Sequence, residues 1–278
     1  MALRVPHEAA LARPLIFGVL NVTPDSFSDG GEHSETSSAI RFATSLYSLG
    51  ADVIDVGGES TRPGAVRVDP DEEQRRVLPV VRELATLGIP VSVDTMNAGT
   101  AERAAAVGAT IINDVTAGAD DPAMASVIAA SDLLFIAMHS RGPSITMDSR
   151  ATYKDTVAEV RAELGQRLEV LVESGIDPTR IIIDPGIGFA KTARHNWELL
   201  AGLGSLAELG HPVFVGASRK RFLGELLPET AGPRDRDAAT AVISALVADA
   251  GVWGVRVHDV PSTKLALDVW SAMRSGTR

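Results

Sequence analysis

The chain of 278 residues contains no cysteine, and aromatic residues make up only 4% of it. Without cysteine, disulfide bonds, thiolate catalysis and zinc sites with thiolate ligands are excluded. No apolar stretch approaches the roughly 18 residues of a membrane-spanning helix, and the N-terminal segment has no apolar core typical of a signal peptide. Basic residues are outnumbered, 26 against 36 acidic ones, so the net charge is −10. Such a charge repels nucleic acid and anionic membranes, and we expect a cytoplasmic protein that binds neither.

What the chain does contain is a series of short apolar runs, most of them followed by a polar side chain. Runs that are apolar on both faces are typical of parallel strands covered on each side. Each interval between runs can hold one amphipathic helix, and the length is close to the roughly 250 residues of one barrel. The sequence therefore predicts an α/β fold, a single (β/α)8 TIM barrel domain over residues 1–278. The predicted strands are 15–20, 51–56, 89–93, 109–112, 133–138, 181–183, 212–217 and 251–255.

The segments between these runs carry apolar residues at helical spacing. Several begin with a capping residue or an N1 proline, such as Asp121-Pro122 and Val260-Pro261. Pro79 lies inside the second of these segments, and we expect it to bend that helix. The predicted helices are 36–49, 71–87, 97–107, 122–130, 152–174, 194–209, 235–249 and 261–273.

Polar side chains stand at the carboxyl ends of the predicted strands, where the active site of a (β/α)8 barrel lies. Because these ends converge, we expect the side chains to line one pocket. Two long loops rich in Gly, Pro and Asp, 23–34 and 60–70, leave the same face and are typical of lids or binding loops. The expected lining residues are Asn21, Asp94, Asn113, His139, Asp184, Lys220, Arg256 and His258.

The densest local chemistry follows the seventh and eighth predicted strands. Ser218-Arg219-Lys220-Arg221 begins a predicted helix, and alternation puts Arg256 and His258 on the same side of the last strand. Barrels commonly bind phosphate in this quadrant through a helix N-terminus and cationic side chains. A lone Lys-Arg pair is more often a solvated helix start, but here two neighbouring strands contribute cations in an acidic chain. We therefore interpret the cluster as a phosphate or diphosphate site.

Asp94, Asn113 and Asp184 are expected opposite that cluster. A single aspartate at a strand end is often only a turn or capping residue, whereas three such residues from three strands cannot all cap one helix. Two carboxylates and an amide suit the amidine edge of a flat heterocycle, because a carboxylate accepts two parallel N–H bonds and an amide both donates and accepts. They could instead hold a divalent metal, although the histidines show neither HxH nor HxxxH spacing. A Mg2+ that bridges one oxygen ligand and a substrate diphosphate is a further interpretation.

Taken together, these segments resemble the dihydropteroate synthase family of folate biosynthesis, from about Ile16 to the last predicted helix. The matching motifs are long and follow one order, which makes the resemblance specific. They are GVLNVTPDSFSDGG (18–31), DVGGESTRPG (55–64), SVDT (92–95), IND (112–114), MH (138–139), DPGIGF (184–189), SRK (218–220) and RVHD (256–259).

The resemblance implies a transferase that condenses 6-hydroxymethyl-7,8-dihydropterin diphosphate with p-aminobenzoate and releases diphosphate and 7,8-dihydropteroate. It also implies Mg2+ as cofactor, these small molecules as substrates, a homodimer that forms through barrel helices, and a target of sulfonamides. We expect C–O cleavage with carbocation character at the pterin methylene, helped by electrostatic stabilisation of the departing diphosphate. Since an arylamine is neutral at pH 7, no strong general base is required, and His258 as a proton shuttle is the weaker interpretation.

The family's residue roles transfer to the positions that match its motifs. The resemblance implies that the pterin is held by Asp94, Asn113, Asp184 and Lys220. It implies that diphosphate is bound by Asn21, Arg256 and His258, with Asn21 also a ligand of Mg2+. These three residues and Lys220 form the expected catalytic set. The expected p-aminobenzoate pocket consists of Phe27, Asp29, Thr61, Arg62, Pro63 and Phe189.

One position departs from some relatives, and two other functions need to be weighed. Arg221 stands where some relatives carry a serine near the benzoate carboxylate, which matters little if the contact comes from the backbone N–H. The segment 140–150 is assigned no role. A barrel that transfers a methyl group from a folate to a corrinoid should lack the two long loops, and both are present. A catalytically silent paralogue that only binds pterin or a partner is disfavoured because every motif residue is intact.

Overall fold

The computed structural model describes residues 12–23, 32–59, 67–143 and 145–276. Within these ranges, eight parallel strands are arranged in the order β6-β5-β4-β3-β2-β1-β8-β7. The two outer strands of this order, β6 and β7, meet through a parallel bridge between Ile183 and Val213. The Ile183 N–H also donates to Pro212 O at 2.9 Å. The sheet thus curls back on itself, and the predicted TIM barrel is confirmed.

All the predicted strands are present, with small shifts of their bounds. The strands are β1 (Leu15–Asn21), β2 (Val53–Gly57), β3 (Val91–Asp94), β4 (Ile111–Asp114), β5 (Leu134–Met138), β6 (Ile181–Asp184), β7 (Phe214–Val215) and β8 (Gly254–Val257). The polar residues Asn21, Asp94 and Asp184 are the last residues of their strands rather than the first residues beyond them. Their backbones are therefore held by the sheet, which fixes the direction of their side chains.

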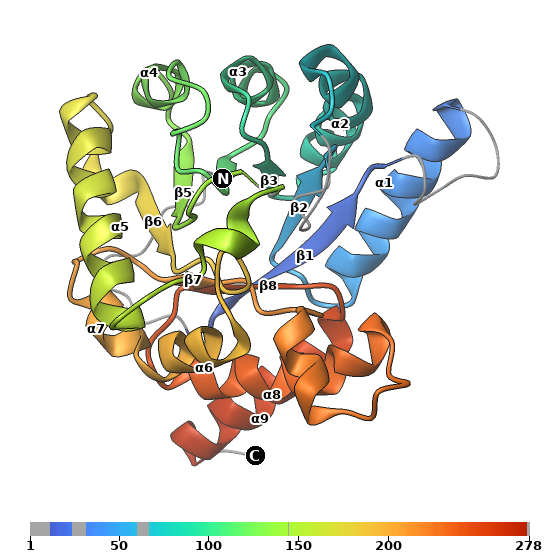
Figure 1. Ribbon diagram of the computed structural model, residues 1–278. Coiled ribbons are helices and arrows are strands. Elements are labelled where there is room, and N and C mark those ends of the chain that lie inside the picture. Colours follow the sequence, from blue (N-terminus) through green and yellow to red (C-terminus); the bar gives the residue numbers. More distant parts are fainter. Residues whose placement is uncertain (1–11, 24–31, 60–66, 144, 277–278) are drawn as a thin grey trace.

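Helices alternate with the strands and surround the barrel (Figure 1). The predicted helix 194–209 is wrong in one respect, because it is two helices that meet at Gly202. A Cβ at Gly202 would lie 2.7 Å from Cγ2 of Val157, so only glycine allows the chain to approach the helix that carries Val157 this closely. Glycine is also a weak helix former, which is consistent with the break at this position. Helix α2 continues through Pro79, and the bend there stays a prediction. The helices are α1 (Glu32–Ser48), α2 (Pro70–Thr86), α3 (Ala98–Ala106), α4 (Met124–Ala129), α5 (Thr156–Glu173), α6 (Ala193–Ala201), α7 (Leu203–Ala207), α8 (Asp237–Ala248) and α9 (Val260–Ser275), with short 3-10 helices η2 (Met147–Arg150), η3 (Pro178–Arg180), η4 (Arg221–Leu226) and η5 (Pro233–Arg236).

Large apolar side chains fill the lower part of the barrel interior. The Phe17 ring lies 4.7 Å from the Phe214 ring and 5.4 Å from the Trp253 ring, centroid to centroid. Side chains alternate along a strand, so a residue two positions later faces the same interior, one level higher. The upper level is polar. The cluster of the lower level consists of Phe17, Val53, Ile111, Leu134, Ile136, Ile182, Phe214 and Trp253.

A second and larger apolar cluster lies between the strands and the helices. It includes Ile16, Leu20 and Ile54 from the outward faces of β1 and β2, and Leu84 from α2. The strands are therefore covered on both faces, which accounts for their nearly continuous apolar character. In the part of the chain that the structure describes, no helix is both long and apolar enough to cross a membrane.

Candidate active site

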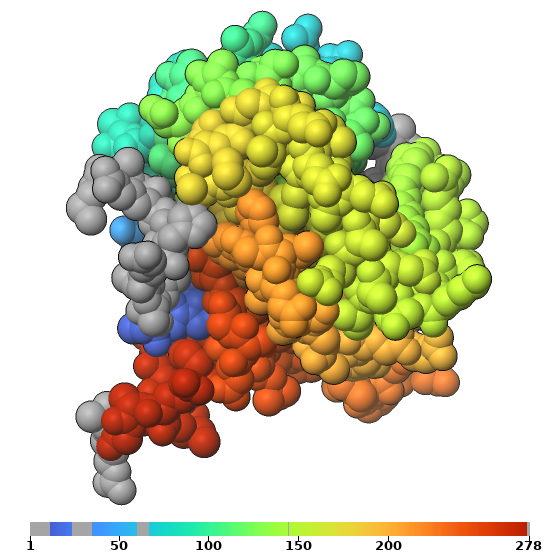
Figure 2. All heavy atoms as spheres, turned by 90° about the vertical axis from the view of Figure 1, so that its left-hand side faces the viewer, coloured from blue at the N-terminus to red at the C-terminus, as the bar shows by residue number. Residues whose placement is uncertain are grey.

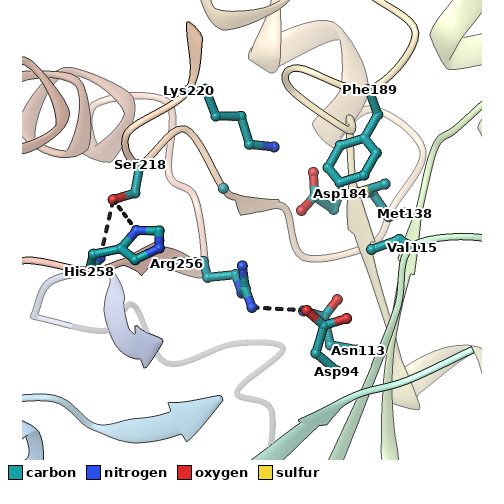
Figure 3. Close-up of a pocket in the computed structure, with 11 residues that line it drawn as sticks. Asp94, Asn113, Val115, Met138, Asp184, Phe189, Ser218, Lys220, Arg256 and His258 are labelled. Carbon is teal, nitrogen blue, oxygen red and sulfur yellow. Dashed lines mark hydrogen bonds and ion pairs between the residues drawn. The ribbon is translucent and has the colours of Figure 1, made fainter. Parts of the chain in front are cut away.

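A pocket opens at the carboxyl ends of the strands (Figure 3). Six strands, β3 to β8, contribute side chains to it directly or from the turns that follow them. The space between the lining side chains, including the open mouth, is about 400 Å³. The pocket is lined by Asp94, Asn113, Val115, Met138, Asp184, Phe189, Gly216, Ser218, Lys220, Arg256 and His258.

Asp94, Asn113 and Asp184 form the acidic side of the pocket, as the sequence predicted. All three side chains are buried, at 6%, 4% and 5% exposure. Burial disfavours a negative charge and raises the pKa of Asp94 to about 7, although the nearby Arg256 opposes it. Burial also raises the pKa of Asp184, which the charge of Lys220 opposes. A ligand that brings N–H donors to these carboxylates would replace the water that burial has removed.

Arg256 spans the pocket and pairs with two carboxylates. Its Nε lies 2.5 Å from Asp55 Oδ2, and its Nη2 lies 2.9 Å from Asp94 Oδ2 (the second contact is dashed in Figure 3). Burial lowers the pKa of Arg256, but the attraction of Asp55 and Asp94 outweighs it and raises this pKa overall. Asn113 Nδ2 also approaches Asp55 Oδ2, at 3.5 Å. Asp55 and Asp94 therefore fix the position of the Arg256 guanidinium, so the cation and the two acids form one paired group.

Asp55 is a site residue that the sequence analysis missed. It is completely buried in β2, two residues after Val53 of the lower level, and one of its oxygens has no hydrogen-bond partner among the described residues. The expected lining residues were the polar ones at the strand ends, whereas Asp55 lies within a strand. Its isolation in an apolar run, ADVIDV, was the available signal, because a carboxylate on the inward face of a buried strand needs a cation.

The prediction of a cationic cluster after β7 is only partly correct. Arg219 turns away from the pocket and makes two 2.7 Å hydrogen bonds to Asp237, and its positive φ of 58° shows that the chain reverses there. Arg221 is exposed and pairs with Asp148 at 2.9 Å, in the segment that was assigned no role. The predicted helix start is only the 3-10 helix η4, which begins at Arg221. Successive residues of a turn point in different directions, so a run of cations does not make one cluster.

Lys220 is the member of the run that enters the pocket. Its Nζ lies 4.4 Å from the centre of the Phe189 ring and donates to the Ile187 carbonyl. Burial lowers the pKa of Lys220 to about 8, which the charge of Asp184 opposes. Lys220 thus brings a cation to the wall that carries Asp184, as Figure 3 shows.

Ser218 and His258 form the rim beside Arg256. Ser218 Oγ lies 2.9 Å from His258 Nδ1 and accepts from the His258 N–H at 3.1 Å (Figure 3). The two contacts fix both the backbone and the ring of His258. His258 and Arg256 line the same pocket, which confirms the alternation expected along β8.

An apolar wall completes the pocket. Val115, Met138 and Met96 pack together, and Phe189 packs against them. Val115 and Met138 were missed, since apolar residues at strand ends cannot be told from core residues by sequence. Phe189 was expected with the p-aminobenzoate residues, and it contributes a flat face to the pocket of Asp94, Asn113 and Asp184.

His139 does not line the pocket, and this expectation is wrong. Its side chain is buried behind the wall, between Glu163 of α5 at 2.9 Å and Lys191 at 2.9 Å. Met138, one residue earlier, faces the pocket. Because successive residues of a strand face opposite sides, only one of the two can point inward.

Asn21 ends β1 at the edge of the pocket rather than in its lining. A Cβ at Gly57 would lie 3.8 Å from both Asn21 Oδ1 and Asp94 Oδ2, so these two oxygens flank Gly57. Among the described residues no group of three or more His, Cys, Asp or Glu side chains could hold a metal ion. The remaining predicted site residues lie outside the described residues: Phe27, Asp29, Thr61, Arg62 and Pro63.

Known proteins are similar to this chain in sequence and in fold. A model of the family described as pterin binding enzyme matches residues 17–258. The dihydropteroate synthase of Mycobacterium leprae is 50% identical over 268 residues, which are 95% of this chain and 94% of the relative. A structure of Xanthomonas albilineans dihydropteroate synthase with 4-aminobenzoic acid is similar, with a TM-score of 0.88, 43% identity, and coverage of 95% of this chain and 94% of the other. A structure of the same enzyme in complex with 7,8-dihydropteroate has a TM-score of 0.83 and 37% identity, over 95% of this chain and 94% of the other.

Proposed function

The chain belongs to the dihydropteroate synthase family of pterin-binding enzymes, which are transferases, and on that premise we propose which reaction it catalyses and how. It condenses 6-hydroxymethyl-7,8-dihydropterin diphosphate with p-aminobenzoate and releases diphosphate and 7,8-dihydropteroate. Support comes from two structures of Xanthomonas albilineans dihydropteroate synthase, one solved with 4-aminobenzoic acid and one with 7,8-dihydropteroate. The observation that carries the proposal is the convergence of Asp94, Asn113 and Asp184 beside an apolar wall.

The pterin lies in this pocket, with its N–H edge against the acidic side. Asp94 and Asp184 accept its N–H bonds, and the Asn113 amide both donates and accepts. Lys220 donates to a ring acceptor and holds Phe189 against the ring face. The buried carboxylates favour this arrangement, because only a ligand with matched donors satisfies them.

The diphosphate lies at the mouth, against Arg256, His258 and Asn21. Arg256 is held by Asp55 and Asp94 at one edge of its guanidinium, which leaves the other edge for an anion. His258 is oriented by Ser218 through its Nδ1, so its Nε2 is the nitrogen that can donate to diphosphate. This assigns to His258 a role in charge stabilisation rather than as a proton shuttle.

Asn21 is the residue that would hold Mg2+. Its Oδ1 lies at the pocket edge near Asp94 Oδ2, and a magnesium ion that is bound mainly by diphosphate and water needs only one or two protein oxygens. The residues therefore fit the ion without an all-protein cage. When bound, the ion would supply a positive charge that stabilises the diphosphate.

The reaction is C–O cleavage with carbocation character at the pterin methylene. Arg256 and His258 stabilise the charge that grows on the departing diphosphate, and the fixed geometry of both side chains avoids reorganisation during the step. The neutral arylamine then attacks the methylene and loses its proton to solvent. Lys220 and Asp184 keep the pterin ring oriented throughout.

We assign p-aminobenzoate to the loops that follow β1 and β2, through Phe27, Asp29, Thr61, Arg62 and Pro63, with Phe189 at their border with the pterin. These loops leave strands that end at Asn21 and Gly57, on the edge of the pocket. A sulfonamide should therefore compete with p-aminobenzoate and not with the pterin. Arg221 is exposed and paired with Asp148, so a contact with the benzoate carboxylate would come from its backbone N–H.

A turnover assay tests this function and its two alternatives. Diphosphate release is followed with and without p-aminobenzoate. Release that depends on p-aminobenzoate, together with formation of 7,8-dihydropteroate, supports the synthase. Pterin binding without release would indicate a silent paralogue. Methyl transfer from a methylated folate to a corrinoid would indicate the methyltransferase.

We also propose a homodimer that forms through α8 and α9, which pack together. These helices expose large apolar side chains, among them Leu246 and Leu265, each 65% exposed, and Met273 at 80%. Figure 2 shows α9, in red, projecting from the body of the molecule, where a second copy can reach it. Sedimentation should give a dimer for the wild type and for Leu87→Glu, an exposed residue beyond α2, and a monomer for Leu246→Glu combined with Leu265→Glu. A wild-type monomer at micromolar concentration would contradict the proposal.

The cytoplasmic location and the lack of binding to nucleic acid and membranes stay predictions from the sequence. The net charge of −10 supports the last two. Cell fractionation and a filter-binding assay with DNA, RNA and anionic vesicles would test them.

A further inference from the structure

A lysine that the mechanism does not use lies directly behind the pocket. Lys191 is 8% exposed, and its Nζ lies 2.9 Å from His139 Nδ1 and 3.0 Å from the Phe189 carbonyl oxygen. Neither Lys191 nor His139 lines the pocket. Phe189 does, and it is the residue to which the lysine is bonded.

The hydrogen-bond roles of His139 are fixed by its two neighbours. The hydrogen bond from His139 lowers the pKa of Glu163 to about 2, so this carboxylate is ionised and accepts. Burial lowers the pKa of His139 to about 4, and the charge of Lys191 adds to this, so the imidazole is neutral at pH 7. The single proton is therefore on Nε2, which donates to Glu163 Oε2 at 2.9 Å. Nδ1 then accepts from Lys191, whose amine has N–H donors whether it is charged or neutral.

This chain of hydrogen bonds ends on the loop between β6 and α6, which carries the pocket residue Phe189 and follows Asp184 directly. The His139 N–H donates to the Asp184 carbonyl at 2.8 Å, and the Gly186 N–H donates to Asp184 Oδ1 at 2.7 Å. Gly186 has a φ of +68°, and a Cβ there would lie 1.9 Å from the His139 carbonyl oxygen. The loop thus crosses directly over His139, and only glycine allows this approach.

Two lysines hold this loop from opposite sides. Lys220 donates to the Ile187 carbonyl from the pocket, while Lys191 donates to the Phe189 carbonyl from the interior. The Gly188 N–H is held as well, by Asn196 Oδ1 at 2.7 Å. The backbone on both sides of the Phe189 ring is therefore tethered, and Lys191 is the residue in the described part of the chain whose side chain bonds to the Phe189 carbonyl itself.

From this geometry we infer that Lys191 is a positioning residue for pterin binding: it fixes Phe189 as the flat wall of the pocket, and Glu163 and His139 orient its amine. The inference rests on the proposed function, since it requires that the pocket binds pterin. Lys191 contacts no substrate. Its effect must therefore pass through Phe189.

That route can be tested by a double-mutant cycle with Lys191→Met and Phe189→Ala. The dissociation constant for 6-hydroxymethylpterin is measured by calorimetry for the wild type, both single variants and the double variant. We expect Lys191→Met to weaken binding about tenfold in the wild-type background and less than about twofold in the Phe189→Ala background, because coupled residues are not additive. Lys264→Met, which removes an exposed lysine of α9, is the matched control and should bind as the wild type does.

The inference is overturned if Lys191→Met binds pterin as tightly as the wild type, or if the two losses are additive. A wild type that fails to bind pterin would instead contradict the proposed function, and the inference would fall with it. Urea unfolding separates positioning from a general loss of structure, since the binding loss must occur in a variant that still unfolds cooperatively.

If Lys191→Met does not fold, the wild type still provides a test. Nitrogen-15 NMR of the His139 ring at pH 7 should show a protonated Nε2 and an unprotonated, hydrogen-bonded Nδ1. A proton on Nδ1, or on both nitrogens, would overturn the proposed hydrogen bonds from Lys191 to His139 and from His139 to Glu163, because Lys191 would then have no acceptor at His139.

Discussion

The lower and upper levels of the barrel interior lie two residues apart on the same strands and have opposite character. On β4, Ile111 is followed by Asn113, and on β6, Ile182 is followed by Asp184. The lower level is a buried apolar cluster, and the upper level carries the buried charges of the pocket. Two residues of strand correspond to roughly 7 Å. The residues that stabilise the fold and the residues that bind the ligand thus lie on adjacent levels of one barrel. We expect a mutation in one level to leave the property of the other level unchanged.

The upper level carries an electrostatic cost that the lower level does not. Burial raises the pKa of Asp94 and of Asp184 and lowers that of Lys220, so the charged forms of these three groups are destabilised, whereas pairing with Asp55 and Asp94 raises the pKa of Arg256. Only mutual pairing and a bound ligand offset this desolvation. We therefore expect mutations of the lower level to change the free energy of unfolding, and mutations of the upper level to change affinity.

The largest effect should come from Phe17→Ala, at the centre of the lower level. Removing a completely buried ring that packs on Phe214 and Trp253 should cost about 3 to 5 kcal/mol in the free energy of unfolding. Urea unfolding measures this loss. The folded fraction should bind 6-hydroxymethylpterin as the wild type does, and a large loss of affinity would show that the two levels are not independent.

For Asp184→Asn we expect a loss of pterin affinity with little change in stability. The amide keeps the shape and can still accept from the Gly186 N–H, but it places a donor where the pterin N–H edge needs an acceptor. The loss of pterin binding should be about 2 to 4 kcal/mol, with little change in the free energy of unfolding. Calorimetry gives the affinity, and an unchanged value would remove Asp184 from the site.

Arg256 and Arg219 sharpen the comparison, because both are paired arginines and only one faces the pocket. Arg256→Ala should weaken binding of diphosphate by about 1.5 to 3 kcal/mol, the usual size of a hydrogen bond to a charged group. Binding of a pterin without diphosphate should change less. Arg219→Ala, which loses a pair with Asp237 outside the pocket, should leave both affinities unchanged. Equal losses for the two ligands in Arg256→Ala would indicate a structural role.

The smallest effect concerns pH. The pKa of Asp94 is raised by burial to about 7 from an ordinary value of 3.8, so between these values the folded state holds a proton that the unfolded state releases. The stability that Asp94 contributes is complete below about pH 4 and is lost as the pH rises to about 7. Relative to the wild type, Asp94→Asn should therefore gain stability across this window, on the order of 1 kcal/mol given the relaxation around buried charges.

Urea unfolding at several pH values from 4 to 8 measures that gain. Asp268→Asn, which removes an exposed carboxylate of α9, is the control. A stability difference between the wild type and Asp94→Asn that does not vary with pH would show that Asp94 titrates alike in the folded and unfolded chains.

The sequence predicted the strands and most of the strand-end residues, because apolar runs and their polar ends are local patterns. It could not predict which residues of a turn point inward. Arg219, Lys220 and Arg221 look alike in sequence, and only Lys220 enters the pocket. His139 and Met138 differ by one position, and the register of β5 decides between them. Asp55 was missed because its partner, Arg256, is 201 residues away in the chain.

The central claim is that the upper level binds pterin. A crystal structure of the protein with 6-hydroxymethylpterin and diphosphate tests it most directly. We predict that the N–H edge of the pterin lies within hydrogen-bond distance of Asp184 and Asn113, with its ring against Phe189 and diphosphate at Arg256. A pterin bound outside this pocket, or one whose N–H edge faces solvent, would contradict the account.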